Sequence, residues 1–395
     1  MSTPGAAKQL APWVLVCGGF HRLGGMDRAN LALAETLLAQ GRTVHLVSHN
    51  IDPELGSHPN AKPIMVPRPL DSILLGERAL QCKGFETAQA VRRHFPDARI
   101  VVNGGNCDFP DINWVHSVHH AWPRLDDEAP LWFRAKSALN KAKAMRDEER
   151  ALLQAKLVIA NSERTRRDLI SMGIQSDKIS TIYLGSEAIW TPASPEQKRQ
   201  ARRTFAIPED AILVCFVGAL GYDRNKGFDT LLRAWKQIQA SNVFLIAAGG
   251  GRGWEKWQTQ VRQSGMADRI RLLGFTDRVN DVYAAADLMV SPVRYEAYGM
   301  NVHEAICRGI PSIVSANAGV AELYERVLRA YLLHDPENVT ALADRLKLVM
   351  ANFDSARRQF SQFGDQLRSR TWKQMAEEII ALAEAPAAKP PQPRG

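Results

Sequence analysis

The chain has 395 residues, is 45% hydrophobic and 23% charged, and carries a formal net charge of +8. Its length predicts two or three domains, each able to bury its own core, and its composition is ordinary for a soluble globular protein. The basic balance fits phosphorylated substrates, an anionic membrane or nucleic acid. Nucleic acid is not expected, because no finger, helix-turn-helix or RNP-like pattern accompanies the charge.

The cysteines are scattered and never form a CxxC pair: Cys17, Cys82, Cys107, Cys215 and Cys307. This odd, dispersed set predicts neither a disulfide framework nor a zinc site and favours a reducing compartment. The first residues lack the basic flank and long apolar core of a signal peptide, and no apolar run reaches the roughly 20 residues that span a bilayer. We therefore expect a cytoplasmic protein, free or peripheral to the inner face of the membrane.

The N-terminal half predicts a doubly wound parallel sheet. A buried strand at 13–19 is followed by a helix at 26–41, which ends at a glycine, and by a second strand at 43–49. This strand-helix-strand unit starts an α/β sheet. Further strands are predicted at 98–103, 111–118, 156–162 and 178–185.

The second half repeats the scheme, with strands at 211–218, 243–251, 269–275, 287–292 and 311–316 and helices at 226–239, 254–265, 281–285 and 300–309. Two such units predict an α/β protein with two Rossmann-like domains facing each other across a central cleft. We place the domains at 1–200 and 201–370. A helix at 371–383 crosses back to the N-terminal domain, and a Pro- and Ala-rich tail at 384–395 is predicted to be disordered.

The loop "GALGYDRNKG" holds Arg224, Lys226 and Gly227 immediately before a predicted helix. Cations beside a helix N-terminus, with a glycine that permits close backbone approach, suit a pyrophosphate. A solvated basic turn explains the same residues equally well. The loop is not a P-loop, because the GxxxxGK[ST] spacing is absent.

The stretch "RYEAYGMNVHEAICRG" places Glu296 at a strand tip and Glu304 about one turn inside a helix that begins at Gly299 and Met300. Eight fully helical residues would separate the carboxylates by about 12 Å along the axis, too far to share a proton or a metal ion. The spacing suits two hydroxyl-bearing rings joined by a diphosphate. The alternative is one glutamate in an exposed turn and one on a helix surface.

The N-terminal half adds weaker candidates. Gly24 and Gly25 stand at a helix start, where a glycine pair permits close approach of a phosphate and where a tight turn is an equal explanation. His116 lies at a strand end, a position that is more often structural. No Cys/His set or DxD motif predicts a metal. The acidic stretch 126–128 is interpreted as a solvated turn.

Three stretches resemble one family: "VGALGYDRNKGFDTLLRAW", "LLGFTDRVNDVYAAADLMVSPVRYEAYGMNVHEAICRGIPSIVSANAGVAEL" and "RTWKQMAEEI". They are similar to the retaining glycosyltransferases of the GT-B fold, family four, the glycosyltransferase group 1 family. The resemblance is strong over 212–375 and weaker in the N-terminal half. Its most specific element is the pair of glutamates followed by a Gly-Xaa-Pro strand start.

The resemblance implies roles for these residues. Glu296 would contact hydroxyls of the transferred sugar and Glu304 the ribose, while His116 would contact the sugar near the reacting carbon. The remaining implied site residues are Arg224 and Lys226 for the diphosphate, Gly24 and Gly25 for donor phosphate and acceptor, and Gly299, Met300 and Asn301 for sugar and phosphate. One departure is that many members have Gly-Arg where this chain has Gly218-Ala219. We infer that Arg224 takes over that cationic role.

The implied activity is transfer of a hexose, with retention, from a nucleotide-diphosphate sugar to a hydroxyl of a saccharide, lipid-linked or small-molecule acceptor, as in polysaccharide biosynthesis. The N-terminal domain would bind the acceptor and the C-terminal domain the donor, with no metal or other cofactor. The alternatives are a sugar-nucleotide epimerase or hydrolase on the same fold and a non-catalytic nucleotide-sugar-binding protein.

The segment 130–150 combines an apolar start with several cations. It is either a basic amphipathic helix that docks on anionic lipid or an ordinary surface helix with i,i+4 ion pairs. The surface helix is the favoured interpretation, because charged helix faces usually meet solvent.

Overall fold

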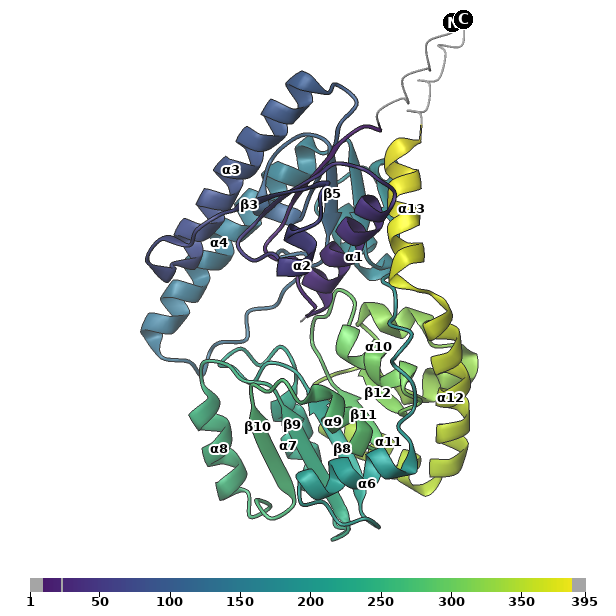
Figure 1. The fold of residues 1–395 in the computed structure, drawn as a ribbon. Helices are drawn as coiled ribbons and strands as arrows, with labels where there is room; N and C mark the ends of the chain where they lie inside the picture. The colour runs from purple at the N-terminus through teal and green to yellow at the C-terminus, as the bar shows by residue number, and fades with distance from the viewer. Residues whose placement is uncertain (1–9, 23, 386–395) are drawn as a thin grey trace, which may run out of the picture.

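The computed structural model describes residues 10–22 and 24–385. It contains two parallel sheets, one in each half of the chain, each flanked by helices (Figure 1). This confirms the predicted α/β class with two domains. The first sheet has the order β3-β2-β1-β4-β5-β6-β7 and the second the order β10-β9-β8-β11-β12-β13.

The strands of the first sheet are β1 (Trp13–Val16), β2 (Val44–Ser48), β3 (Ala61–Met65), β4 (Arg99–Val102), β5 (Ile112–Val115), β6 (Leu157–Ala160) and β7 (Ile179–Thr181). The helices of this half are α1 (Gly25–Ala39), α2 (Pro53–Gly56), α3 (Ile73–His94), α4 (Leu131–Gln154) and α5 (Glu163–Ser171). Short 3-10 turns occur at η1 (Pro69–Asp71), η2 (Gly104–Asn106) and η3 (Ser176–Lys178).

The strands of the second sheet are β8 (Ile212–Val217), β9 (Val243–Ala248), β10 (Ile270–Gly274), β11 (Leu288–Ser291), β12 (Ser312–Ser315) and β13 (Leu332–Leu333). The helices of the second half are α6 (Pro195–Thr204), α7 (Phe228–Trp235), α8 (Trp254–Gln263), α9 (Val279–Ala285), α10 (Met300–Cys307), α11 (Val339–Ala351), α12 (Phe353–Ser369) and α13 (Trp372–Glu384). Two 3-10 turns, η4 (Gly319–Leu323) and η5 (Arg326–Tyr331), follow β12.

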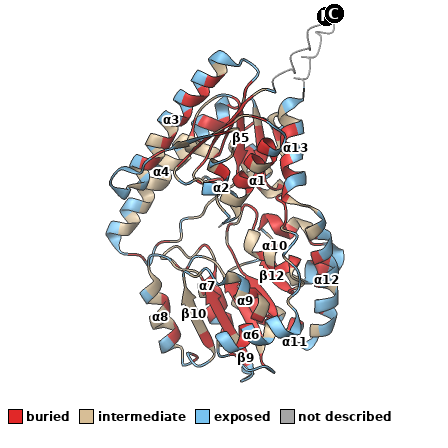
Figure 2. Ribbon diagram, viewed as in Figure 1, coloured by how far each residue is buried: buried red, intermediate tan, exposed pale blue. Residues whose placement is uncertain are grey.

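Burial explains why the central strands form. The four residues of β1 are all buried, as are those of β5, β11 and β12. Continuous apolar runs of this kind are typical of parallel strands covered by helices on both faces. In Figure 2 the buried positions follow the strands and the inner faces of the helices, while the outer faces of α3 and α12 are exposed.

The change from one domain to the other occurs earlier than the predicted boundary at residue 200. Helix α6 packs against α9 of the second domain, and the Arg202 guanidinium pairs with the buried carboxylate of Asp287. The predicted boundary at 200 falls inside α6, and Lys198, which precedes it, also pairs with Asp287, so the whole helix lies with the second domain.

The last helix lies against the first domain. α13 packs along α1 (Figure 1), and Arg42 Nη1 is 2.6 Å from Glu384 Oε1. The crossing is tight at Gly185, where an added Cβ would lie 2.4 Å from the Trp372 amide nitrogen. The tail predicted to be disordered begins at residue 384, but Glu384 is the last residue of α13. Residues 386–395 of that tail lie outside the described residues.

Among the described residues, no helix is both long enough and apolar enough to cross a membrane.

Candidate active site

Two neighbouring strands at the centre of the second sheet place the main candidate residues. β8 and β11 pair in parallel, and their helical connections run to opposite sides, so the strand order reverses between them. Loops at the carboxyl ends of such strands form the usual ligand site of an open α/β sheet. The loop 218–227 follows β8, and the loop 292–299 follows β11.

Asn225 holds these two loops together. Its side chain is buried, donates to the Tyr295 carbonyl at 2.8 Å and accepts from the Tyr295 amide at 2.8 Å. Gly227 has φ +74 and packs so closely that an added Cβ would lie 1.9 Å from the Pro292 carbonyl oxygen. The loops are therefore in fixed register, although about 70 residues separate them. No local sequence pattern points to Asn225, because its role depends on this long-range pairing.

The fixed alignment of these two loops brings Lys226 and Glu296, two of the predicted site residues, together. Lys226 Nζ is 2.5 Å from Glu296 Oε2, with 28% of the lysine side chain and 20% of the glutamate side chain exposed. The Glu296 carbonyl accepts from the Gly319 amide at 3.2 Å, which anchors the backbone below the carboxylate. A cation and a carboxylate thus meet at a partly open position at the strand ends.

Helix α10 begins beside this pair. Gly299 is its N-cap with φ +106, a conformation that favours glycine. The amides of Gly299, Met300 and Asn301 donate to no acceptor within residues 10–22 and 24–385. The Asn301 side chain instead donates to the Val217 carbonyl at 2.7 Å and ties the helix start to β8. Free amides at a helix N-terminus can receive an anion.

Glu304 lies on the same helix, one turn further along. Burial raises the pKa of its carboxyl group to about 7, although the Arg308 guanidinium and the Tyr283 hydroxyl act in the opposite direction. Tyr283 also donates to the Asn301 carbonyl at 2.9 Å. Glu304 is therefore not the freely solvated surface glutamate of the alternative interpretation.

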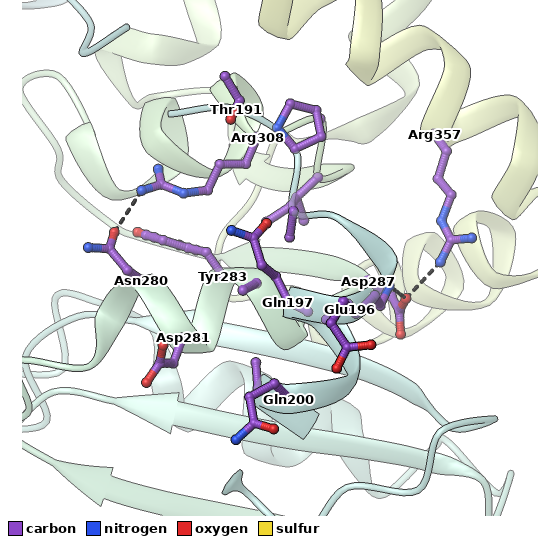
Figure 3. A pocket seen from close by; sticks show the side chains of 18 of the residues that line it. Thr191, Glu196, Gln197, Gln200, Asn280, Asp281, Tyr283, Asp287, Arg308 and Arg357 are labelled. Atoms are coloured by element: carbon purple, nitrogen blue, oxygen red, sulfur yellow. Dashed lines mark hydrogen bonds and ion pairs between the residues drawn. The ribbon is translucent and has the colours of Figure 1, made fainter. Parts of the chain in front are cut away.

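Tyr283 and Arg308 also line a pocket of about 920 Å³ between α6, α9 and α12 (Figure 3). Its other lining residues include Asp287 and Arg357, which form an ion pair of 2.7 Å. None of the predicted site residues lines this pocket.

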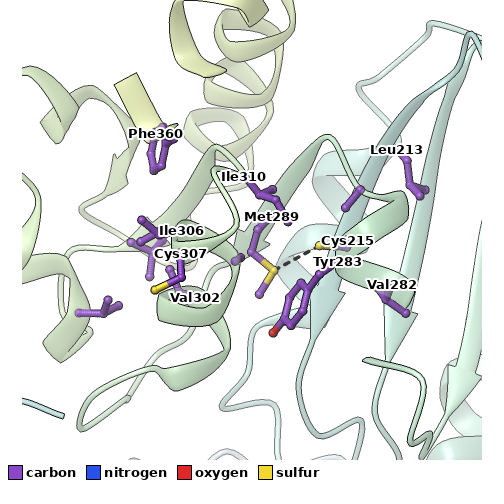
Figure 4. Packing of buried hydrophobic residues seen from close by; sticks show 14 of the residues in the cluster. Leu213, Cys215, Val282, Tyr283, Met289, Val302, Ile306, Cys307, Ile310 and Phe360 are labelled. Atoms are coloured by element: carbon purple, nitrogen blue, oxygen red, sulfur yellow. Dashed lines mark hydrogen bonds between the residues drawn. The ribbon is translucent and has the colours of Figure 1, made fainter. Parts of the chain in front are cut away.

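The apolar core beneath the site supports α10. Val302 and Ile306 of α10 belong to one buried cluster with Cys215 and Met289 of the two central strands (Figure 4). Phe360 of α12 belongs to the same cluster. The Cys215 thiol is buried and free, as the sequence predicts for a cysteine inside a strand. Because these side chains are close-packed, the helix start has little freedom to move relative to β8 and β11.

The first domain approaches the site through α1. A Cβ added to Gly25 would lie 2.5 Å from Met300 Cγ, so the first turns of α1 and α10 are in contact. Gly24 caps α1 with φ +82, and a Cβ added to it would meet no atom of the described residues within 4 Å. The glycine pair is thus placed beside the helix start that carries the free amides.

His116 follows β5 and packs on Trp114 with ring centroids 4.5 Å apart. Both ring nitrogens are shielded from solvent and have no partner among the described residues. Burial lowers the pKa of His116 to about 3, so the imidazole is neutral at physiological pH. It can offer one donor and one acceptor to a ligand but no charge.

The stretch 126–128 contains a turn in which Asp127 and Glu128 are exposed, as predicted, but both carboxylates are paired rather than free in solvent. Asp127 Oδ1 is 2.5 Å and Glu128 Oε1 is 2.9 Å from the Arg224 guanidinium, and Glu128 also pairs with Lys256. These ion pairs join the first domain to the loop after β8. Arg224 is therefore engaged by carboxylates of the first domain, whereas Lys226 faces Glu296.

Further contacts between the domains surround the site. The Ser162 hydroxyl donates to the Ala297 carbonyl at 2.6 Å, and the Val118 amide donates to the Tyr295 hydroxyl at 2.8 Å. Sequence patterns did not single out these residues, because each partner lies in the other half of the chain.

Within the part of the chain that the structure describes, no group of three or more His, Cys, Asp or Glu side chains is arranged to hold a metal ion.

Fold and site together define a protein of the GT-B class. The chain superimposes on the Anabaena protein HepE, in a complex with UDP and glucose, with a TM-score of 0.71, 18% identity and coverage of 95% of this chain and 100% of the other. At this identity the likeness shows the fold alone.

The family follows from the sequence matches. The model of the glycosyl transferases group 1 matches residues 197–366, and that of glycosyltransferase family 4 matches residues 23–187. The chain belongs to the group 1 glycosyltransferase family.

Two curated relatives illustrate the similarity. An uncharacterised glycosyltransferase of Methanocaldococcus jannaschii is 29% identical over 203 residues, 50% of this chain and 51% of the relative. A D-inositol 3-phosphate glycosyltransferase of Mycolicibacterium smegmatis is 29% identical over 180 residues, 44% of this chain and 40% of the relative. The chain thus spans about half the length of the curated relatives it matches or somewhat less.

Proposed function

We propose that the protein transfers a hexose from a nucleotide-diphosphate sugar to an acceptor hydroxyl, with retention at the anomeric carbon. The observation that carries this proposal is the Lys226–Glu296 pair beside the free amides at the start of α10. A diphosphate needs positive charge and amide donors, and a sugar needs a hydrogen-bond acceptor. Support also comes from the family and from HepE, whose structure holds UDP and glucose.

In the proposed donor complex the N-termini of α1 and α10 and the Lys226 ammonium group surround the diphosphate. Glu296 accepts hydrogen bonds from the sugar and Glu304 from the ribose. The acceptor oxygen bonds to the anomeric carbon as the bond from that carbon to the diphosphate oxygen breaks, and the acceptor proton passes to the departing diphosphate. Preformed donors around a leaving group stabilise the charge that develops on it. The chemistry is proposed without a metal, because Lys226 and the amides can meet this charge.

Product analysis tests the proposal. Nucleotide sugars with UDP, GDP and ADP as carriers are incubated with and without a panel of acceptors, and released nucleotide and new glycoside are quantified by mass spectrometry. We expect acceptor-dependent release with equal amounts of glycoside, whose anomeric configuration by NMR matches the donor. Release of nucleotide without glycoside would instead indicate a hydrolase, and a new nucleotide sugar an epimerase.

A variant separates an enzyme from a non-catalytic binder. Glu296→Ala is expected to lower transfer at least ~100-fold, the scale of losing one interaction with the transition state. Binding without turnover in the wild-type protein, with every donor and acceptor tried, would favour the binder.

A further inference from the structure

A second cavity lies in the first domain, at the carboxyl ends of β1 and β2 and the start of α1. Its volume is about 440 Å³, within the range of small-molecule sites. Its lining includes His21, Met26, Asp27, His49, Asn50 and Arg68. The donor-site residues discussed above do not line it.

One end of the cavity is a paired acid and imidazole. His21 Nε2 is 3.2 Å from Asp27 Oδ2, and 28% and 22% of the two side chains are exposed. The other polar atoms of the pair, Asp27 Oδ1 and His21 Nδ1, are buried with no partner among the described residues. The loop fits tightly here, since a Cβ on Gly19 would lie 2.9 Å from Asp27 Oδ1. The pair is thus held in place, and its exposed edge can bind hydroxyl groups.

The other end is cationic. The Arg68 side chain is exposed and makes no ion pair or hydrogen bond within the described ranges. Its aliphatic part packs on α3, where a Cβ on Gly76 would lie 2.9 Å from Arg68 Cγ. His49 lies against the same glycine and donates through Nδ1 to the Val66 carbonyl at 2.8 Å. Its Nε2 is therefore an acceptor in the neutral ring and a donor to a phosphate oxygen in the protonated ring. An arginine of this kind, positioned but unpaired, is suited to a phosphate.

The order of the strands and helices shows which end of the cavity lies nearer the donor site. Asp27 lies two residues after Gly25, the residue in contact with Met300 at the donor site. Arg68 follows β3 at the far edge of the sheet. The hydroxyl-binding end is therefore near the donor, and the cationic end is remote from it.

We propose that this cavity binds the acceptor, and that the acceptor is a phosphorylated polyol or sugar with its phosphate at Arg68 and His49 and its hydroxyls at His21 and Asp27. That the bound molecule is an acceptor rests on the proposed transferase function. Its binding to this cavity can be measured without any turnover.

The test is isothermal titration of the full chain with hexose 6-phosphates and myo-inositol 1-phosphate. The unphosphorylated parents, inorganic phosphate and glucuronate are titrated in parallel. We expect at least one phosphate ester to bind ~10-fold or more tightly than its parent, the scale of one charge-assisted hydrogen bond. If glucuronate alone binds, or if a parent binds as well as its ester, the phosphate assignment is overturned.

Matched variants locate the site. Arg68→Gln should weaken the ester at least ~10-fold, whereas Arg22→Gln should leave it unchanged, because Arg22 is also exposed but lies outside the cavity lining. Both variants should keep wild-type affinity for the nucleotide sugar and wild-type melting temperature. Equal binding by Arg68→Gln and wild type, or no binding of any ester, would overturn the proposal. Donor binding without ester binding refutes this inference alone, and ester binding without transfer of any donor refutes the proposed function alone.

Discussion

The raised pKa of Glu304 predicts that donor affinity depends on pH. Burial raises this pKa to about 7, so the carboxyl group is mostly protonated at pH 6 and mostly ionised at pH 8. The ionised fraction rises from about one-tenth to about nine-tenths over this interval for a single group of that pKa. If the carboxylate is the form that accepts the ribose hydroxyls, the dissociation constant should fall roughly tenfold from pH 6 to pH 8.

The assay is isothermal titration with an intact nucleotide sugar at pH 6, 7 and 8. A free nucleoside diphosphate is unsuitable, because its terminal phosphate titrates near pH 6 as a phosphate monoester does. Glu304→Gln is the control, since it keeps the shape and loses the charge. A wild-type dissociation constant that is constant across this range, or a pH dependence that persists in Glu304→Gln, would show that ionisation of Glu304 does not control donor affinity.

The raised pKa of the Glu304 carboxyl group also makes the folding stability depend on pH. Because its folded pKa lies above the unfolded value, the protonated form stabilises the fold below the unfolded pKa, and this contribution is lost as pH rises through about 7. Glu304→Gln should therefore raise the melting temperature of the ligand-free protein at pH 8 and have little effect near pH 5. If Glu304→Gln raised the melting temperature equally at both pH values, the ionised Glu304 carboxylate would not be the cause of the instability.

Three further predictions follow from other parts of the molecule. Lys226→Ala should lower transfer ~100-fold, and Arg224→Ala clearly less, because Arg224 is engaged by carboxylates of the first domain; equal losses in steady-state assays would contradict this. Gly227→Ala should lower the free energy of unfolding in urea by more than Gly173→Ala. Both glycines have positive φ, but a Cβ added at Gly227 would lie 1.9 Å from the Pro292 carbonyl oxygen, whereas one added at Gly173 would meet no atom within 4 Å. If α4 docks on lipid, Trp132→Glu, at a position 61% exposed, should reduce co-sedimentation with anionic vesicles and leave the melting temperature unchanged; wild-type protein that stays in the supernatant would favour the ordinary surface helix.

The central strands could be predicted from the sequence because burial on both faces leaves a continuous apolar run. β3 could not, because it is an edge strand with exposed positions and a proline at 63, and such a strand carries no apolar pattern. β13 has only two residues and forms because β12 offers it a partner. These elements are determined by tertiary contacts rather than by local pattern.

The candidate site likewise has features that the sequence predicts and features that only tertiary contacts determine. Lys226 and Glu296 were found singly, from their positions after strands, but their 2.5 Å contact depends on the Asn225 bridge between distant loops. The sequence-based assignment of Arg224 to the diphosphate rests on its place before a helix and on the absence of the family's arginine at Gly218-Ala219. Its pairing with Asp127 and Glu128 could not be predicted, since it depends on how the two domains meet.

The most direct test of the proposed donor site is a crystal structure of the protein with an intact nucleotide sugar. We expect the diphosphate at the amides of Gly299–Asn301 with Lys226 alongside, the sugar at Glu296 and the ribose at Glu304. A nucleotide bound elsewhere, for example in the pocket between α6, α9 and α12, with the Lys226–Glu296 pair intact and unliganded, would contradict it.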